Sequence, residues 1–201
     1  MPQFRILTPG NSCNVIRANY RDYKRPWLVN DFSQKCGYCG DHDMWAGGWR
    51  GMQIDHFAPK KKFPDLKSTY SNLVYSCFYC NNNKSDDWVT NSPDPSISED
   101  NSRGYIHPRL ELYNEIFERD VSGKIIALTD VAKYMHKQLC LGLARHRMIF
   151  VLEELYNLWR ELNQIVLSEE IDEDKRMQFE ENKSNISKKF MEYFSHYRSV
   201  V

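Results

Sequence analysis

Four of the six cysteines stand in two Cys-x-x-Cys pairs, at Cys36, Cys39, Cys77 and Cys80. A Cys-x-x-Cys turn presents two thiolates to one metal ion, and two such turns complete a tetrahedral zinc site. Because four thiolates leave no open coordination position, we expect a structural Zn²⁺ rather than a catalytic one. Cysteines used in this way indicate a reducing compartment, so the sequence predicts a cytoplasmic protein.

Polar residues suited to phosphodiester hydrolysis lie between the cysteine pairs and directly after the second one. A histidine with a pKa of about 6.5, here His56, is a fit general base at neutral pH. Asp55 and Asn81 offer hard oxygen ligands for Mg²⁺ or Mn²⁺. Asn83 replaces Asn81 as the ligand if the following helix begins later. An isolated Asp-His pair would instead favour an acid at a strand end beside a partly buried histidine.

Lysines follow the Asp-His pair at Lys60, Lys61 and Lys62, and Lys84 follows the second cysteine pair. Beside a phosphate-cleaving site these lysines are candidates to bind the backbone phosphates of a nucleic acid. Alternatively, Lys60, Lys61 and Lys62 form an ordinary solvated loop, and Lys84 lies on the exposed surface of a helix. Lys plus Arg and Asp plus Glu each total 27, so the net charge is zero. This balance excludes a globally basic protein that coats nucleic acid, and any binding requires a local patch.

A strand over Met52–Phe57 and a helix from Asn81 to about Val89 would position these residues. In a regular strand Asp55 and His56 point to opposite faces. Both can serve one site only if the strand ends or bulges at His56, and the nearby Pro59 favours an ending.

The rest of the chain is expected to be mainly helical, with an N-terminal helix over Arg21–Phe32 and a small hairpin over Ile116–Leu128. Beyond Thr129, apolar residues at spacings of three and four predict two long helices, separated by the acidic stretch Ser168–Asp174. We expect these helices to pack on each other or on the core, whereas a partner-binding face is the less favoured alternative. The apolar seams are Met148, Leu152, Leu155, Trp159, Leu162 and Val166, then Ile186, Phe190, Tyr193 and Tyr197.

The fold class expected is α+β, with a small zinc-stapled ββα core, a helical N-terminal segment and a mostly α-helical C-terminal region. The expected divisions are 1–34, the N-terminal segment with its helix; 35–90, the zinc-bound core; 91–128, a linker and small hairpin; and 129–201, the C-terminal helical region. The sequence holds no long apolar run, which argues against a membrane partner. Because so small a core buries little apolar surface, we expect it to unfold without zinc.

Three motifs together resemble the HNH, or ββα-metal, nuclease family over roughly residues 35–88. They are Ile54-Asp-His-Phe-Ala-Pro59, Ser71-Asn-Leu73 and Cys77-Phe-Tyr-Cys-Asn-Asn-Asn-Lys84. The resemblance implies a metal-dependent endonuclease that acts on DNA.

The resemblance also implies a role for each polar residue of the motif. His56 would be the general base, Asn72 would orient it, and Asp55 and Asn81 would hold the catalytic Mg²⁺ or Mn²⁺. The family often has histidine at its last position, where this chain has Asn81.

A narrower resemblance rests on Cys36-Gly-Tyr-Cys39, Phe63-Pro-Asp-Leu66, Gly104-Tyr-Ile-His-Pro108 and the Leu139–Arg147 stretch. These features are similar to small HNH proteins that accompany retrons or Septu-type ATPases in bacterial anti-phage systems. They imply an effector nuclease with a defence-system ATPase as its partner.

Two other functions remain open at this point. A catalytically silent zinc module could bind DNA or a partner through the same fold, although such a module does not need the full set of polar residues. A restriction or mobile-element nuclease with its own sequence readout is disfavoured, since no recognition helix or strongly basic domain is evident.

Overall fold

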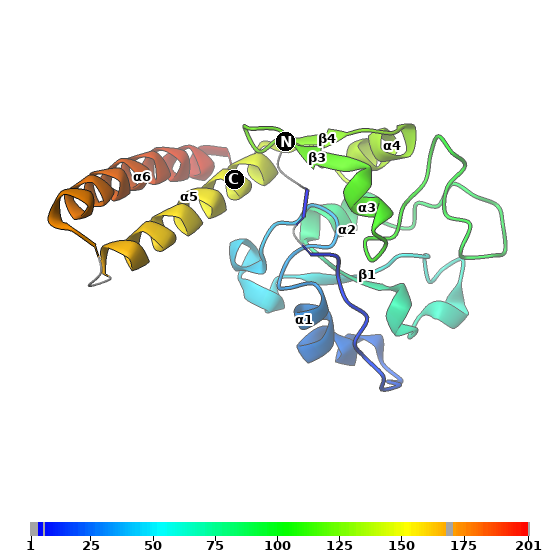
Figure 1. Ribbon diagram of the computed structural model, residues 1–201. Coiled ribbons are helices and arrows are strands. Elements are labelled where there is room, and N and C mark those ends of the chain that lie inside the picture. The colour runs from blue at the N-terminus through cyan, green and yellow to red at the C-terminus, as the bar shows by residue number, and fades with distance from the viewer. Residues whose placement is uncertain (1–3, 6, 168–170, 201) are drawn as a thin grey trace. The chain divides into compact units, whose positions relative to one another are not determined.

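The computed structural model describes residues 4–5, 7–167 and 171–200. The chain divides into two compact units, Met1–Gly142 and Leu143–Val201 (Figure 1). Helix α4 (Asp130–Gln138) therefore belongs to the first unit, although the sequence assigned everything beyond residue 128 to one C-terminal region.

The expected N-terminal helix is a run of three short helical pieces. A 3₁₀ turn over Tyr20–Tyr23 and a π turn over Lys24–Leu28 lead into α1 (Val29–Asp31). The run is interrupted at Arg25, which has the extended angles φ −131° and ψ 134°. This residue precedes Pro26, and the proline ring disfavours the helical conformation for the residue before it. Leu28 and Phe32 are buried and Trp27 is half-buried, so the apolar side chains of this run face the core.

The ββα core consists of β1 (Gln53–His56), β2 (Leu73–Ser76) and α2 (Phe78–Lys84). The two strands pair antiparallel in a regular register, with Asp55 opposite Val74 and His56 opposite Leu73. The strand therefore ends at His56, as the sequence predicted.

Helix α2 differs from its prediction at both ends. It begins directly after Cys77, whose Sγ accepts a hydrogen bond from the Cys80 amide at 3.5 Å and so caps the helix. It stops at Lys84 because Ser85 takes a left-handed φ of 51°. Asn81 consequently lies in the middle of the helix rather than at its start.

The predicted second hairpin is confirmed as β3 (Phe117–Arg119) paired antiparallel with β4 (Ile125–Ala127). The carboxylate of Asp120 shapes the turn, because its Oδ1 accepts from the amides of Ser122 at 2.8 Å and Lys124 at 3.0 Å. Short helices flank this hairpin, α3 (Leu112–Glu115) before it and α4 after it.

Residues far away in sequence hold the backbone of the first cysteine turn. The Arg5 guanidinium donates to the Gly37 carbonyl oxygen at 3.0 Å. The Tyr113 hydroxyl donates to the carbonyl oxygen of Tyr38 at 2.8 Å, and the Arg119 guanidinium donates to that of Cys39 at 2.8 Å. Tyr113 and Arg119 are buried. One continuous hydrophobic core runs through the first unit, from Phe4 to Leu141, and includes all four paired cysteines.

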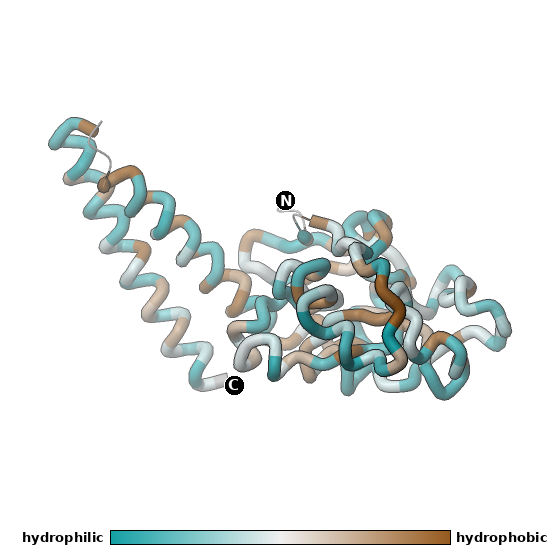
Figure 2. The backbone as a smooth tube through the Cα atoms, turned by 90° about the horizontal axis from the view of Figure 1, so that it is seen from below, coloured by the Kyte–Doolittle hydropathy of each residue, from teal (hydrophilic) through white to brown (hydrophobic). Residues whose placement is uncertain are grey.

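The second unit is a hairpin of two long helices, α5 (Ala144–Val166) and α6 (Glu173–Val200). The two helices lie side by side in both views, and hydrophobic segments recur along each of them (Figures 1 and 2). All ten residues of the predicted seams are buried or half-buried, so the predicted helix pair is confirmed. Part of the predicted acidic break, residues 168–170, lies outside the described residues. None of the described helices has the length and apolar character needed to span a bilayer.

Candidate functional site

The four paired cysteines form a buried cluster in which all Sγ atoms lie within 4.8 Å of one another. The Sγ atoms of Cys39 and Cys77 are 3.8 Å apart. Zinc–sulfur bonds of about 2.3 Å in a tetrahedron place two sulfurs about 3.8 Å apart, whereas a disulfide joins them at about 2.0 Å. The cluster therefore fits a zinc ion bound by four sulfurs.

The clustering of the buried sulfur atoms affects their acidity in both directions. Burial raises the pKa of the Cys39 and Cys80 thiols well above the usual value. At Cys36 burial acts in the same direction, but hydrogen bonds with the other three cysteines outweigh it and lower the pKa well below the usual value. Thiolates grouped in this interior therefore require a cation to offset their charge.

Asp55 and His56 point to opposite faces of β1, because the strand is regular up to its last residue. Asp55 is 5% exposed, and its Oδ2 accepts a hydrogen bond from the Tyr38 hydroxyl at 2.5 Å. The ammonium of Lys84 lies 3.1 Å from the same oxygen and also donates to the His56 carbonyl oxygen at 3.1 Å. The Asp55 carboxylate is thus held inside the first unit by one hydroxyl and one cation.

Lys84 is fully buried, at 0% exposure. The sequence suggested either a phosphate contact or a helix-surface lysine at this position, and the structure corrects both. Its side chain turns inward because α2 packs on β1, where an ammonium gains the carboxylate of Asp55 as a partner.

His56 is oriented by the loop between β1 and β2. Its Nε2 lies 2.9 Å from the carbonyl oxygen of Lys67, and a carbonyl can only accept, so the neutral ring carries its proton on Nε2. The ring of Tyr20 packs edge-on against the imidazole, with 4.6 Å between centroids. Burial lowers the pKa of His56 below 6.5, and the nearby charge of Lys60 acts in the same direction. At pH 7 the imidazole is therefore neutral, with a lone pair on Nδ1.

Asn72 ties down the same loop without touching the imidazole. Its Oδ1 accepts from the Ala58 amide at 2.8 Å, and its Nδ2 donates to the carbonyl oxygens of Ala58 at 3.0 Å and Leu66 at 3.3 Å. Since Leu66 precedes the residue that binds His56, this side chain fixes the carbonyl that orients the imidazole.

Asn81 contacts the face of β1 that carries Asp55. Its Nδ2 donates to Oε1 of Gln53 at 2.5 Å, and Gln53 lies two residues before Asp55, on the same side of the strand. Asn83 is exposed, and its Nδ2 donates to the Tyr79 carbonyl oxygen at 2.8 Å. Asp55 and Asn81 offer a carboxylate and an amide oxygen, the hard donors that Mg²⁺ or Mn²⁺ prefers. The structure does not bring Asp55 to one site with His56, because the two side chains lie on opposite faces of β1 and the Asp55 carboxylate is bonded to Tyr38 and Lys84.

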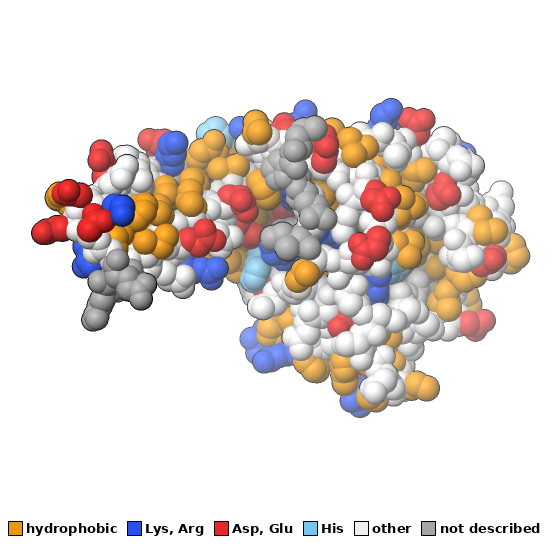
Figure 3. All heavy atoms as spheres, viewed as in Figure 1, with side chains coloured by type: hydrophobic (Ala, Val, Ile, Leu, Met, Phe, Trp, Pro, Cys, Tyr) orange, Lys and Arg blue, Asp and Glu red, His pale blue; other side chains and the backbone are white. Residues whose placement is uncertain are grey.

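The three consecutive lysines differ in their surroundings. All three are exposed, and Lys62 also donates through Nζ to the carbonyl oxygen of Thr90. On the face shown in Figure 3, acidic and basic side chains are intermixed over both units, as the zero net charge leads one to expect.

Sequence reasoning missed two residues that touch the site, Tyr20 beside His56 and Tyr38 beside Asp55. Tyr38 lies within the first Cys-x-x-Cys turn, so its place next to the core could have been inferred. Tyr20 had a weaker signal, since Asn19 before it is a favourable helix N-cap and accepts from the Arg21 amide.

Residues 36–87 match the model of the HNH endonuclease family. The matched segment contains both cysteine pairs, the Asp-His pair, Asn72 and α2. The match supports a nuclease-type function for this part of the 201-residue chain. Searches of curated proteins and of solved structures gave no match.

Proposed function

We propose that residues 36–87 carry a metal-dependent endonuclease site that hydrolyses DNA phosphodiester bonds. The observation that carries this proposal is the state of His56. Its imidazole is neutral, is fixed through Nε2 by the Lys67 carbonyl oxygen, and keeps the lone pair of Nδ1 for a proton.

In the proposed reaction, Nδ1 of His56 takes a proton from a water molecule while the water oxygen attacks the phosphorus atom. The bond between phosphorus and the leaving oxygen breaks on the opposite side, and that oxygen takes a proton from solvent. We propose Asp55 and Asn81 as the ligands of a Mg²⁺ or Mn²⁺ ion, which would supply a Lewis acid for the phosphate charge, because their motif resembles that of the HNH family. In this structure the Asp55 carboxylate is paired with Lys84 instead. Asn72 and the Lys67 carbonyl oxygen act as positioning groups, since they fix the ring of the base.

We further propose that the protein is an effector nuclease of an anti-phage defence system, with a defence-system ATPase as its partner. The support is the resemblance carried by the motifs at 36–39, 63–66 and 104–108. A cytoplasmic location is proposed with it, because a cluster of four reduced cysteines requires a reducing compartment.

Plasmid cleavage with added Mg²⁺ or Mn²⁺ tests the nuclease proposal. We expect His56→Ala to lower the cleavage rate at least about 100-fold, since general-base catalysis contributes about that much or more. His196→Ala, which removes an exposed histidine from α6, should cut like the wild type. The wild-type rate should fall as the pH drops through the lowered pKa of His56, so the active plateau should extend below pH 6.5.

Equal cutting by wild type and a folded His56→Ala protein would contradict the proposal. DNA binding without any cutting, also in the presence of a neighbouring ATPase, would favour the silent zinc module.

A further inference from the structure

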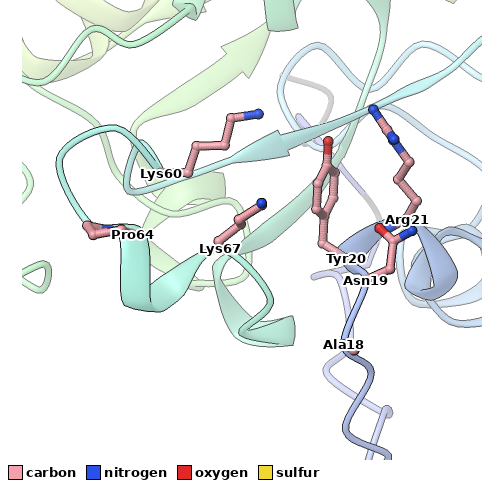
Figure 4. Close-up of a pocket in the computed structure, with 7 residues that line it drawn as sticks. All are labelled: Ala18, Asn19, Tyr20, Arg21, Lys60, Pro64 and Lys67. Carbon is pink, nitrogen blue, oxygen red and sulfur yellow. The ribbon is translucent and has the colours of Figure 1, made fainter.

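A pocket of about 530 Å³ opens beside the proposed base (Figure 4). Residues 18–21 of the N-terminal segment form one wall, and Lys60, Pro64 and Lys67 from the loop between β1 and β2 form the other. Residues 18–21 lie outside the segment that matches the HNH family. The pocket therefore joins a part of the chain with no assigned role to the proposed nuclease site.

Two residues of the pocket lining, Tyr20 and Lys67, also contact His56. The ring of Tyr20 lines the pocket and packs against the imidazole at 4.6 Å, while Lys67 lines the pocket and accepts the His56 hydrogen bond through its carbonyl oxygen. A group held in this pocket would therefore be separated from the general base by the Tyr20 ring.

The charged residues of the pocket lining are Arg21, Lys60 and Lys67, all exposed. The Lys60 ammonium lies 5.6 Å from the centroid of the Tyr20 ring, and the Arg21 guanidinium 5.5 Å from it. In Figure 4 the side chains of Lys60 and Lys67 both extend toward Tyr20. In a chain with zero net charge, three cations that line one pocket form a local basic site.

We propose that this pocket is a subsite for a backbone phosphate of the bound DNA strand, next to the phosphate that is cleaved. Arg21 offers a planar fork that suits two phosphate oxygens, and Lys60 and Lys67 act as point charges. Tyr20 spaces this phosphate from His56. The position of the subsite relative to a cleaved bond rests on the proposed function, whereas the binding of DNA phosphate does not.

The test is the affinity of the full-length protein for a short fluorescent DNA duplex, without added Mg²⁺ or Mn²⁺, by anisotropy over a range of salt concentrations. We expect Arg21→Ala, Lys60→Ala and Lys67→Ala each to weaken binding about tenfold, as for the loss of one charge-assisted hydrogen bond. The slope of log Kd against log salt should fall by about one for each phosphate contact removed. Inorganic phosphate at matched ionic strength should compete only weakly, because it replaces one contact of many.

Lys124→Ala is the matched control, because it removes the same charge from the exposed turn of the β3–β4 hairpin and does not line the pocket. Thermal melting of each variant shows whether it is folded. Folded pocket variants that bind DNA like Lys124→Ala, or a wild type that prefers inorganic phosphate to DNA, would overturn the subsite. A wild type that binds DNA through these residues but never cuts it would refute the proposed function and leave the subsite standing.

Discussion

The two units of this protein are stabilised in different ways. The second unit consists of two helices of 23 and 28 residues with one apolar seam along each. The first unit is assembled from short strands and helices around a cysteine cluster and a buried ion pair. A long amphipathic helix pair gains its stability from repeated contacts along one face, whereas short elements need specific polar or metal links.

The range of the side-chain hydrogen bonds shows the same contrast. In α6 the Ser187 hydroxyl donates to the carbonyl oxygen of Lys183, four residues earlier. The Ser199 hydroxyl donates to the carbonyl oxygen of His196, three residues earlier. In the first unit Arg119 reaches Cys39, 80 positions away, and Tyr113 reaches Tyr38, 75 positions away. The first cysteine turn is held by such long-range links, and the loss of any one of them should weaken the first unit alone.

Removal of zinc should show the difference in stability between the two units most clearly. We expect a strong chelator, or Cys77→Ser, to unfold the first unit, because the binding energy of a structural zinc is comparable to the whole stability of a domain. The helical circular dichroism of α5 and α6 should remain. An unchanged melting curve after verified zinc loss would refute both the structural zinc and this part of the comparison.

Replacement of the buried cation should have the next largest effect. Lys84→Met leaves the Asp55 carboxylate buried without its partner, and we expect a loss of about 3–5 kcal/mol in the free energy of unfolding of the first unit. Adding Asp55→Leu should restore much of it, since the double variant buries no charge. Chemical denaturation measures both variants, and equal stability of Lys84→Met and wild type would show that the ion pair is unimportant.

Acid should destabilise the first unit through His107. This imidazole accepts the Arg109 amide through Nδ1 at 3.0 Å, and burial, aided by the Arg109 charge, lowers its pKa to about 3. The neutral form is favoured in the folded state, so its contribution is complete above about pH 6.5 and is lost as the pH falls toward 3. We expect a loss of about 2 kcal/mol at pH 5, reduced in His107→Gln, which cannot titrate. A wild type and His107→Gln with the same pH dependence of melting would contradict this.

The smallest effect is expected in the second unit. Val166→Ala removes two methyl groups from a buried position near the end of α5, which should cost about 1–2 kcal/mol. The first unit should keep its own stability, which zinc-dependent melting can report. A variant that weakens both units equally would show that they unfold together and would break the comparison.

The sequence was informative where the pattern is local. The cysteine spacing predicted the cluster, and the period of the apolar residues predicted α5 and α6. A strand was predicted over Met52–Phe57 and is observed over Gln53–His56, one residue shorter at each end, with Pro59 limiting its continuation.

The sequence was uninformative where partners are distant or unusual. The start of α2 was placed too late because its cap is Cys77, and cysteine is not among the preferred capping residues. The burial of Lys84 depends on Asp55 and on the packing of α2 against β1, which no local pattern encodes. Likewise, nothing in residues 18–21 indicates that Tyr20 lies against His56.

The hydrogen bonds from Arg5, Tyr113 and Arg119 to the first cysteine turn have a practical consequence for engineering. All three donors lie outside residues 36–87, and so does the Tyr20 wall of the basic pocket. The matched segment is therefore not expected to fold stably on its own. A fragment reduced to residues 36–87, or grafted into another protein, would lack these three hydrogen-bond donors. A minimal stable fragment should therefore begin before Arg5 and extend past Arg119.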